Sequence, residues 1–310
     1  MIDVDTFLTT LYVMVDDFCQ LRHAHKKHSP GPTASLQCSE VITLAICGQW
    51  AQFSSERAFY RYAEQHLRAA FPQLPDRAQF NRLLREHRDA ITAFGLHLVE
   101  SMRAQECPYE VLDSTAAVTR DAKRRGLGWL AGQADIGWSN RIGWDEGFHL
   151  LLSVTPMGVI TGFGFGPAST HDQHLVATLF ATRPRPSPRL PSAGQPAHGS
   201  YVEDLGFAGE RPRQRWQAML QVDLVTPPHQ RSKWIHWPKA LRRWLAGLRQ
   251  IIETVNDKLL NTFRLARERP HDLTGFQARL AAKVSLHNFC IWFNLHLGRA
   301  PLAFADLLAW

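Results

Sequence analysis

One short run constrains this chain more than any other stretch: YEVLDST, at positions 109–115. Its apolar residues are typical of a buried strand, and a strand that ends at Asp113 would direct that carboxylate into a pocket at the sheet edge. A second strand-like run, GSYVED, ends at Asp204, and a glycine two residues later permits a tight turn. A third carboxylate, Glu253, lies in a segment with helical periodicity.

Three carboxylates from two strands and a helix form a set of hard oxygen ligands that suits two Mg²⁺ ions. Paired ions of this kind clamp the attacking and leaving oxygens in a phosphodiester displacement. The chain holds 28 acidic residues, so spacing alone does not single out this set. Asp223 is the alternative to Asp204 as the second acid, but it lies in the middle of a predicted strand at 220–226 instead of at its end.

Four segments resemble the DDE transposases of bacterial insertion sequences: VLDST from position 111, HLLLSVTPMGVITGFGFGPASTHD from 149, EDLGF from 203 and LRQIIETVNDKL from 248. The similarity extends from about residue 36 to residue 297. It implies that Asp113, Asp204 and Glu253 are the catalytic residues and the metal ligands. It also implies two Mg²⁺ ions as cofactors, with Mn²⁺ as a substitute.

The resemblance implies an α/β fold in which helices flank a ribonuclease-H-like mixed sheet of five strands, three antiparallel and two parallel. An all-helical N-terminal region at 1–105, expected to bind DNA, would precede the catalytic domain at 106–310. A loop rich in Pro and Arg is expected at about 183–198. The basic helix predicted after Asp76 is compatible with DNA reading, and equally with a packing domain that carries solvated arginines.

Further elements follow from periodicity and turn chemistry. Ser39, Ser54 or Ser55, and Asp76 are expected to cap helices, a helix is expected at 90–102, and 119–147 is expected to be a loop that faces the substrate. Strands are expected at 148–155 and 159–165, joined by a turn at 156–158. The expected later helices span 171–181 with Thr170 as cap, 209–219, 238–263 and 276–297, and in the last of them His287 and Asn288 satisfy polar groups of the core.

Charge favours a polyanionic partner, because 35 basic residues exceed 28 acidic ones and the net charge is +7. Basic residues flank each of the three acids, which indicates a phosphate-lined substrate. The predicted partner is double-stranded DNA, namely terminal inverted repeats and target DNA. The residues expected to contact it are Arg124, Arg125, Arg211, Arg213, Lys233, Arg242 and Arg249.

Two motifs depart from the family pattern. Relatives carry Asp-Lys-Gly-Tyr where this chain has Asp-Leu-Gly-Phe after Glu203. Of the Tyr-Arg-Glu-Lys signature only Arg249 and Glu253 remain, because Ala246 and Leu260 occupy the other two positions. All three carboxylates are retained, which favours retained chemistry.

The five cysteines include no CxxC pair, and no apolar run approaches the length of a membrane helix. These features predict a cytoplasmic protein that acts on DNA without a membrane partner, and a homodimer is compatible with them. The expected function is metal-dependent DNA cleavage and strand transfer at the ends of an insertion sequence. Two alternatives stay open: a nuclease of the same fold that does not join ends, and a non-enzymatic DNA-binding protein derived from a transposase.

Overall fold

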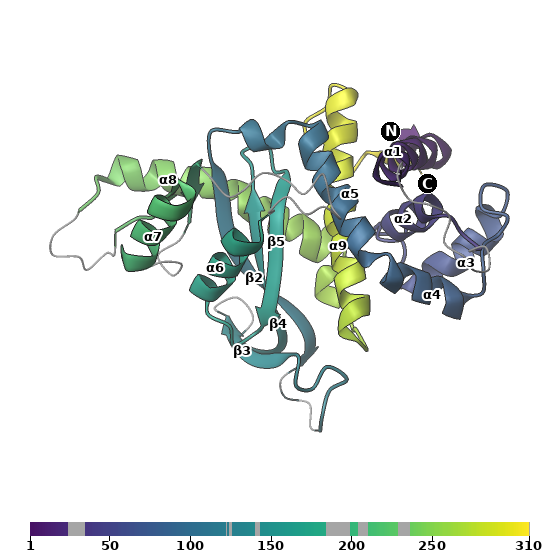
Figure 1. The fold of residues 1–310 in the computed structure, drawn as a ribbon, viewed down its shortest axis with the longest axis horizontal. Coiled ribbons are helices and arrows are strands. Elements are labelled where there is room, and N and C mark those ends of the chain that lie inside the picture. The colour runs from purple at the N-terminus through teal and green to yellow at the C-terminus, as the bar shows by residue number, and fades with distance from the viewer. Residues whose placement is uncertain are drawn as a thin grey trace.

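The structure is a computed structural model, and it describes residues 1–23, 35–121, 123, 126–139, 143–183, 199–203, 210–228 and 236–309. A mixed sheet lies beside a group of N-terminal helices, and the long helix α9 stands between the two (Figure 1). The two ends of the chain meet in a short parallel pairing of β1 (Ile2–Asp3) with β8 (Leu308–Ala309).

Several of the N-terminal helices start where capping side chains satisfy their first amide groups. Ser55 accepts a hydrogen bond from the Ala58 amide and Asp76 accepts from Ala78 and Gln79, as the sequence predicts. These helices are α1 (Val4–His23), α2 (Cys38–Cys47), α3 (Glu56–His66), α4 (Arg77–Glu86) and α5 (Arg88–Ser101), followed by the 3₁₀ turn η1 (Ala104–Glu106).

Two cap predictions are wrong. Helix α2 begins one residue before Ser39, which is buried inside the helix, because Gln37 and Glu40 form a capping box instead. Helix α6 (Asp172–Thr182) is capped by the His171 ring, which accepts from the Gln173 amide, and Thr170 lies outside it.

The sheet has five strand positions in the order β5–β4–β2–β6–β7, and β3 extends it along the free part of β4. Strands β5, β4 and β2 are antiparallel neighbours, whereas β6 and β7 join β2 in parallel. This order confirms the predicted ribonuclease-H-like mixed sheet. The strands are β2 (Glu110–Asp121), β3 (Asp135–Ser139), β4 (Gly143–Val154), β5 (Ile160–Pro167), β6 (Gly199–Val202) and β7 (Val222–Val225).

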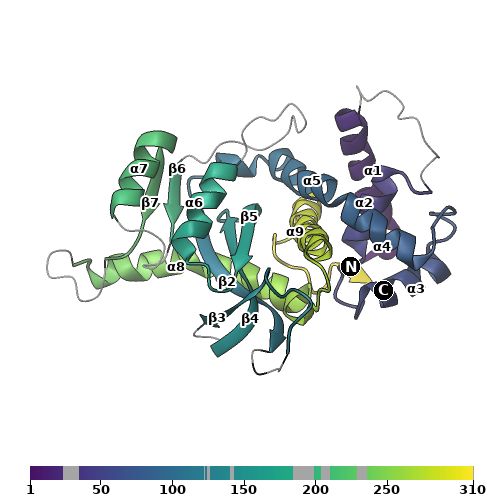
Figure 2. The same cartoon turned by 60° about the horizontal axis from the view of Figure 1, so that its bottom comes forward.

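Helices cover both faces of the sheet. Leu112 and Leu151 pack with α6 and with Trp216 of α7 (Glu210–Leu220) in one buried cluster. The opposite face packs against α8 (Lys239–Asp257), so α6 and α8 lie on opposite sides of β2 (Figure 2). The π-helical turn η2 (Lys258–Thr262) and the 3₁₀ turn η3 (Leu265–Arg267) then lead to α9 (Leu273–His296).

The main hydrophobic core is shared by the N-terminal helices and the sheet. It joins side chains of α1, α2, α4 and α5 to α9 and to the α8 face of the sheet. Asn288 of α9 completes the connection, because its side chain bonds both the amide and the carbonyl of Ile160 in β5. His287 donates to the Gly158 carbonyl in the turn before that strand. The predicted role of both residues in satisfying core polar groups is confirmed.

The structure corrects the description of the region after Asp113. Strand β2 continues to Asp121, so Asp113 lies inside the strand and not at its end. The predicted loop at 119–147 is wrong, because within it the structure forms the rest of β2, β3 and the start of β4. Cross-strand pairing explains the difference, since Trp138 and Trp144 face each other edge-on across β3 and β4 in a segment without clear apolar alternation.

Other predictions fall on residues outside the described ranges: most of the loop at 183–198, and the glycine turn at 206. Among the residues that the structure describes, no helix is both long and apolar enough to cross a membrane.

Candidate active site

Asp113 lies on the α8 face of β2, opposite Leu152 of β4. Its side chain is about one-fifth exposed, and α8 supplies two polar neighbours for it. The Asn256 side-chain nitrogen donates to Oδ2 at 3.2 Å, and the Arg249 guanidinium lies 3.9 Å from Oδ1. The carboxylate is therefore held in position while part of it faces solvent.

Glu253 lies on the same helical face as these two neighbours. Arg249, Glu253 and Asn256 are spaced four and three residues apart, which places them one above another on α8. Because the first and third members of this row reach Asp113, the exposed Glu253 between them lies on the side of α8 that faces β2. The structure thus brings together the regions of the first and third predicted acids.

Asp204, the second predicted acid, lies outside the described residues. Its strand β6 runs parallel to β2, with Val202 level with Val111. In sequence, Asp113 comes two residues after Val111, and Asp204 comes two residues after Val202.

Asp223 occupies a different level of the sheet. Val225 is level with Val202, and therefore with Val111, so Asp223 lies two residues below that level while Asp113 lies two residues above it. Along the strand direction, Asp223 and Asp113 are therefore four residues apart, which corresponds to about 13 Å. Asp223 lies inside β7 and is exposed.

Behind Asp113, on the opposite face of β2, the sheet holds a buried ion pair that sequence reasoning missed. The Glu110 carboxylate accepts two hydrogen bonds from the Arg183 guanidinium, at 2.7 and 2.8 Å, and others from Ser153 and Thr161. Arg183 also donates to the Tyr201 hydroxyl of β6. Burial alone would lower the pKa of Arg183, but Glu110 and Tyr201 raise it, so the guanidinium stays charged. A polar residue inside the otherwise apolar start of β2 was the available signal.

The predicted DNA-contacting residues differ in how far they are exposed to solvent. Arg242 is exposed on α8 seven residues before Arg249, and Arg211 is exposed on α7. Arg213 is half-buried and donates to the Thr226 hydroxyl and the Leu224 carbonyl. Arg124, Arg125 and Lys233 lie outside the described residues.

The donor set fits a hard divalent cation. Asp113 and Glu253 offer carboxylate oxygens, and Asn256 Oδ1 is buried near them without a hydrogen-bond donor among the described residues. Amide and carboxylate oxygens are the ligands that Mg²⁺ prefers. Within the described ranges no three His, Cys, Asp or Glu side chains converge as a metal site, and Asp204, the second predicted acid, is not part of those ranges.

A model of the family described as "Transposase DDE domain" matches residues 111–289, which is more than half of the chain. The match begins in β2, two residues before Asp113, and ends inside α9. Neither a curated protein nor a solved structure matches the chain.

Proposed function

The chain belongs to the family of transposase DDE domains, a family of phosphoryl-transfer enzymes that cleave DNA during transposition, and on that premise we propose that Asp113, Asp204 and Glu253 are its catalytic acids. The observation that supports this assignment is that Arg249 and Asn256, which share one face of α8 with Glu253, both contact Asp113. The parallel pairing of β6 with β2 supports Asp204 as the partner acid.

Members of this family generally use divalent metal ions, and two Mg²⁺ ions would supply charge stabilisation and an activated oxygen nucleophile here. The three carboxylates would hold the ions, and Asn256 would fix the orientation of Asp113 through its amide. Arg249, beside Asp113, would neutralise charge that builds up on the phosphate as it is attacked.

The reaction we propose has two displacements. A water oxygen first bonds to phosphorus at the element end and the bond to the 3′ oxygen breaks, which leaves a 3′-hydroxyl and a 5′-phosphate. That 3′-hydroxyl oxygen then attacks a target phosphodiester and displaces the target's own 3′ oxygen. The substrates are the terminal inverted repeats of an insertion sequence and a target duplex.

A nuclease that performs only the first displacement is the second candidate, because the same acids would serve it. The test is incubation of labelled repeat-end DNA, taken from the flanks of the gene, with a target plasmid and Mg²⁺. Plasmid that gains the label supports strand transfer. Cleaved ends without any joined product would favour the nuclease.

Metal dependence is tested in the same assay with EDTA, Mg²⁺, Mn²⁺ or Ca²⁺. Mg²⁺ and Mn²⁺ are expected to support cleavage, whereas Ca²⁺ is expected to permit DNA binding with little cutting, because its looser coordination positions the reacting oxygens poorly. Full activity in EDTA would refute the metal-dependent mechanism.

A further inference from the structure

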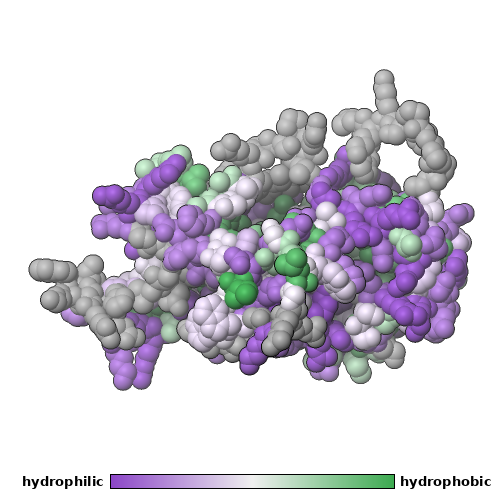
Figure 3. Space-filling view, turned by 90° about the horizontal axis from the view of Figure 1, so that it is seen from below, coloured by the Kyte–Doolittle hydropathy of each residue, from purple (hydrophilic) through white to green (hydrophobic). Residues whose placement is uncertain are grey.

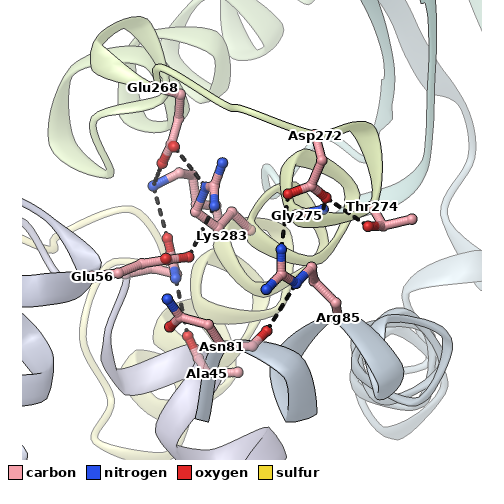
Figure 4. Close-up of polar contacts among 11 residues, drawn as sticks. Ala45, Glu56, Asn81, Arg85, Glu268, Asp272, Thr274, Gly275 and Lys283 are labelled. Atoms are coloured by element: carbon pink, nitrogen blue, oxygen red, sulfur yellow. Dashed lines mark hydrogen bonds and ion pairs between the residues drawn. The ribbon is translucent and has the colours of Figure 1, made fainter. Parts of the chain in front are cut away.

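A cleft of about 480 Å³, whose lining includes neither Asp113 nor Glu253, lies where the N-terminal helices meet the segment that leads into α9. Its walls come from α2, α3 and α4 on one side, and from η3 and the first turns of α9 on the other. Figure 4 shows polar side chains from these elements pointing toward one another, among them Glu56, Glu268 and Lys283. Figure 3 shows a predominantly hydrophilic surface at the end of the molecule where α3 and α4 lie.

The carboxylates that line the cleft are all paired with cations. Glu268 bonds Lys283 at 3.0 Å and Arg279 at 2.7 Å, and Arg279 also bonds Glu56 at 2.9 Å. At the cleft's other end, Asp272 bonds Arg85 at 2.9 Å. Burial alone would raise the pKa of Glu268, but Lys283 and Arg279 hold it below its ordinary value. These acids therefore neutralise the inner cations and leave the outer ones uncompensated.

Five further arginines line the cleft, and none of them forms an ion pair with a carboxylate among the described residues: Arg57, Arg77, Arg264, Arg267 and Arg269. Arg57, Arg77 and Arg267 are exposed, so their guanidinium groups reach solvent at the cleft's rim. Arg264 adopts a left-handed backbone conformation with φ 61°, which is uncommon for a residue with a side chain. The cleft thus presents a concentrated positive charge over a neutral floor.

A second hollow adjoins it and shares Arg269. Its lining includes Arg120 and Trp129, and the Trp129 ring is 70% exposed and packs beside the ring of His271. An exposed aromatic ring close to arginine side chains suits a nucleic-acid strand, because the cations contact phosphates and the ring can stack on a base.

We propose that this arginine-lined cleft binds the phosphate backbone of the DNA substrate, as a contact surface separate from the catalytic acids. The proposal rests on the proposed function, since it takes DNA as the partner. A guanidinium group can donate two parallel hydrogen bonds to a phosphate group. The arginines of the cleft come both from the N-terminal helices and from the segment between α8 and α9. A DNA strand in the cleft would therefore contact both parts of the chain.

The test compares two double variants of the full chain that remove equal charge from the same two helices. Arg57→Ala with Arg77→Ala removes cleft arginines, whereas Arg61→Ala with Arg82→Ala removes exposed arginines outside the cleft. Binding of a labelled duplex of the repeat end is measured in EDTA, which prevents cleavage, over a range of salt concentrations. Circular dichroism of each variant checks the fold.

For the cleft variant, the slope of log affinity against log salt is expected to become shallower by about two, at about 0.9 per lost phosphate contact. The control variant is expected to keep the wild-type slope. Equal slopes for both variants would overturn the proposal. A shallower slope in the control variant alone would also overturn it, and would instead favour DNA contact by the faces of α3 and α4 that carry Arg61 and Arg82. If wild-type protein failed to bind DNA, both this proposal and the proposed function would fail.

Free phosphate groups share the chemistry of the DNA backbone, so ATP and inorganic phosphate serve as separate arms of the experiment. Neither is expected to displace the duplex except at concentrations that act through ionic strength. Tight ATP binding that disappears in the cleft variant, while duplex binding stays unchanged, would identify a nucleotide pocket and contradict the proposal.

Discussion

Asp113 depends on its neighbours for its orientation. A carboxylate on a strand has two side-chain torsions, and the amide of Asn256 restricts them by donating to one oxygen. Such neighbours of a metal-binding carboxylate tune its affinity for the ion, and their loss typically costs ten- to a hundredfold. Asn256 was not recognised from the sequence, although it continues the row formed by Arg249 and Glu253.

We expect Asn256→Ala to raise the Mg²⁺ concentration that gives half-maximal cleavage by roughly ten- to a hundredfold. The measurement is a Mg²⁺ titration of repeat-end cleavage. Asn261→Ala is the matched control, because Asn261 is exposed just beyond α8 and bonds Asp257 instead. An unchanged Mg²⁺ requirement in the Asn256 variant would show that the amide does not position Asp113.

His287 is a second residue with a specific physical consequence. Its ring is fully buried, Nε2 donates to the Gly158 carbonyl, and Nδ1 has no hydrogen-bond partner among the described residues. Burial lowers the pKa of His287 from 6.5 to about 4, because protonation would place an unpaired charge in the core. The folded state therefore holds the ring neutral, whereas the unfolded state binds a proton below about pH 6.5.

Stability linked to His287 is present above its unfolded pKa and is lost as the pH falls toward its folded pKa. Between about pH 7 and about pH 5 the loss should reach about 2 kcal/mol of the free energy of unfolding. Urea unfolding at both pH values measures it. In His287→Gln, which retains a donor for Gly158, this part of the pH dependence should disappear. An equal pH dependence in the variant would assign the effect to other groups.

Among the elements, β2 has two distinct roles on its two faces. Asp113 lies toward α8, whereas Glu110 lies toward α6 and ties β2 to β4, β5 and Arg183 at the end of α6. Charges as deeply buried as these are costly to leave without a partner. The ion pair thus maintains the alignment of β2, which carries Asp113, with β4 and β5.

We expect Arg183→Met to lower the free energy of unfolding by about 3–5 kcal/mol, because the buried Glu110 carboxylate would lose its ionic partner. Combining it with Glu110→Gln should recover much of that loss, since no carboxylate is then left unpaired. Urea unfolding measures both. The matched control is Arg103→Met, whose solvent-exposed pair with Glu106 should contribute far less to the free energy of unfolding. Similar losses for Arg183→Met and Arg103→Met would contradict the account.

Strong local signals made some elements predictable from the sequence. Ser55 and Asp76 predicted the starts of α3 and α4. The turn residues at 156–158 predicted the boundary between β4 and β5. The same reasoning wrongly predicted a loop at 119–147. The strands there form because β4 pairs with both β2 and β3, which are contacts that local sequence signals do not reveal. The row of residues on α8 was predictable for Arg249 and Glu253, whereas the contact of Asn256 with Asp113 depends on how α8 crosses the sheet.

At the scale of the whole molecule, the N-terminal helices and the sheet share α9. Helix α9 packs against α2, α4 and α5, and Asn288 ties it to β5. The predicted division at residues 105 and 106 stays a prediction, and the shared core implies that the two parts stabilise each other. The arginine-lined cleft lies at this junction, so the proposed DNA contact lies where both parts meet.

The central claim is that Asp113, Asp204 and Glu253 form one catalytic site, and single-acid variants test it most directly. Cleavage of repeat-end DNA is measured with Asp113→Asn, Asp204→Asn, Glu253→Gln and, as the matched control, Asp223→Asn. Each of the first three should lose roughly a thousandfold in rate while still binding DNA, because each removes a metal ligand. Asp223→Asn should cleave at nearly the wild-type rate. An essential Asp223 together with a dispensable Asp204 would contradict the account.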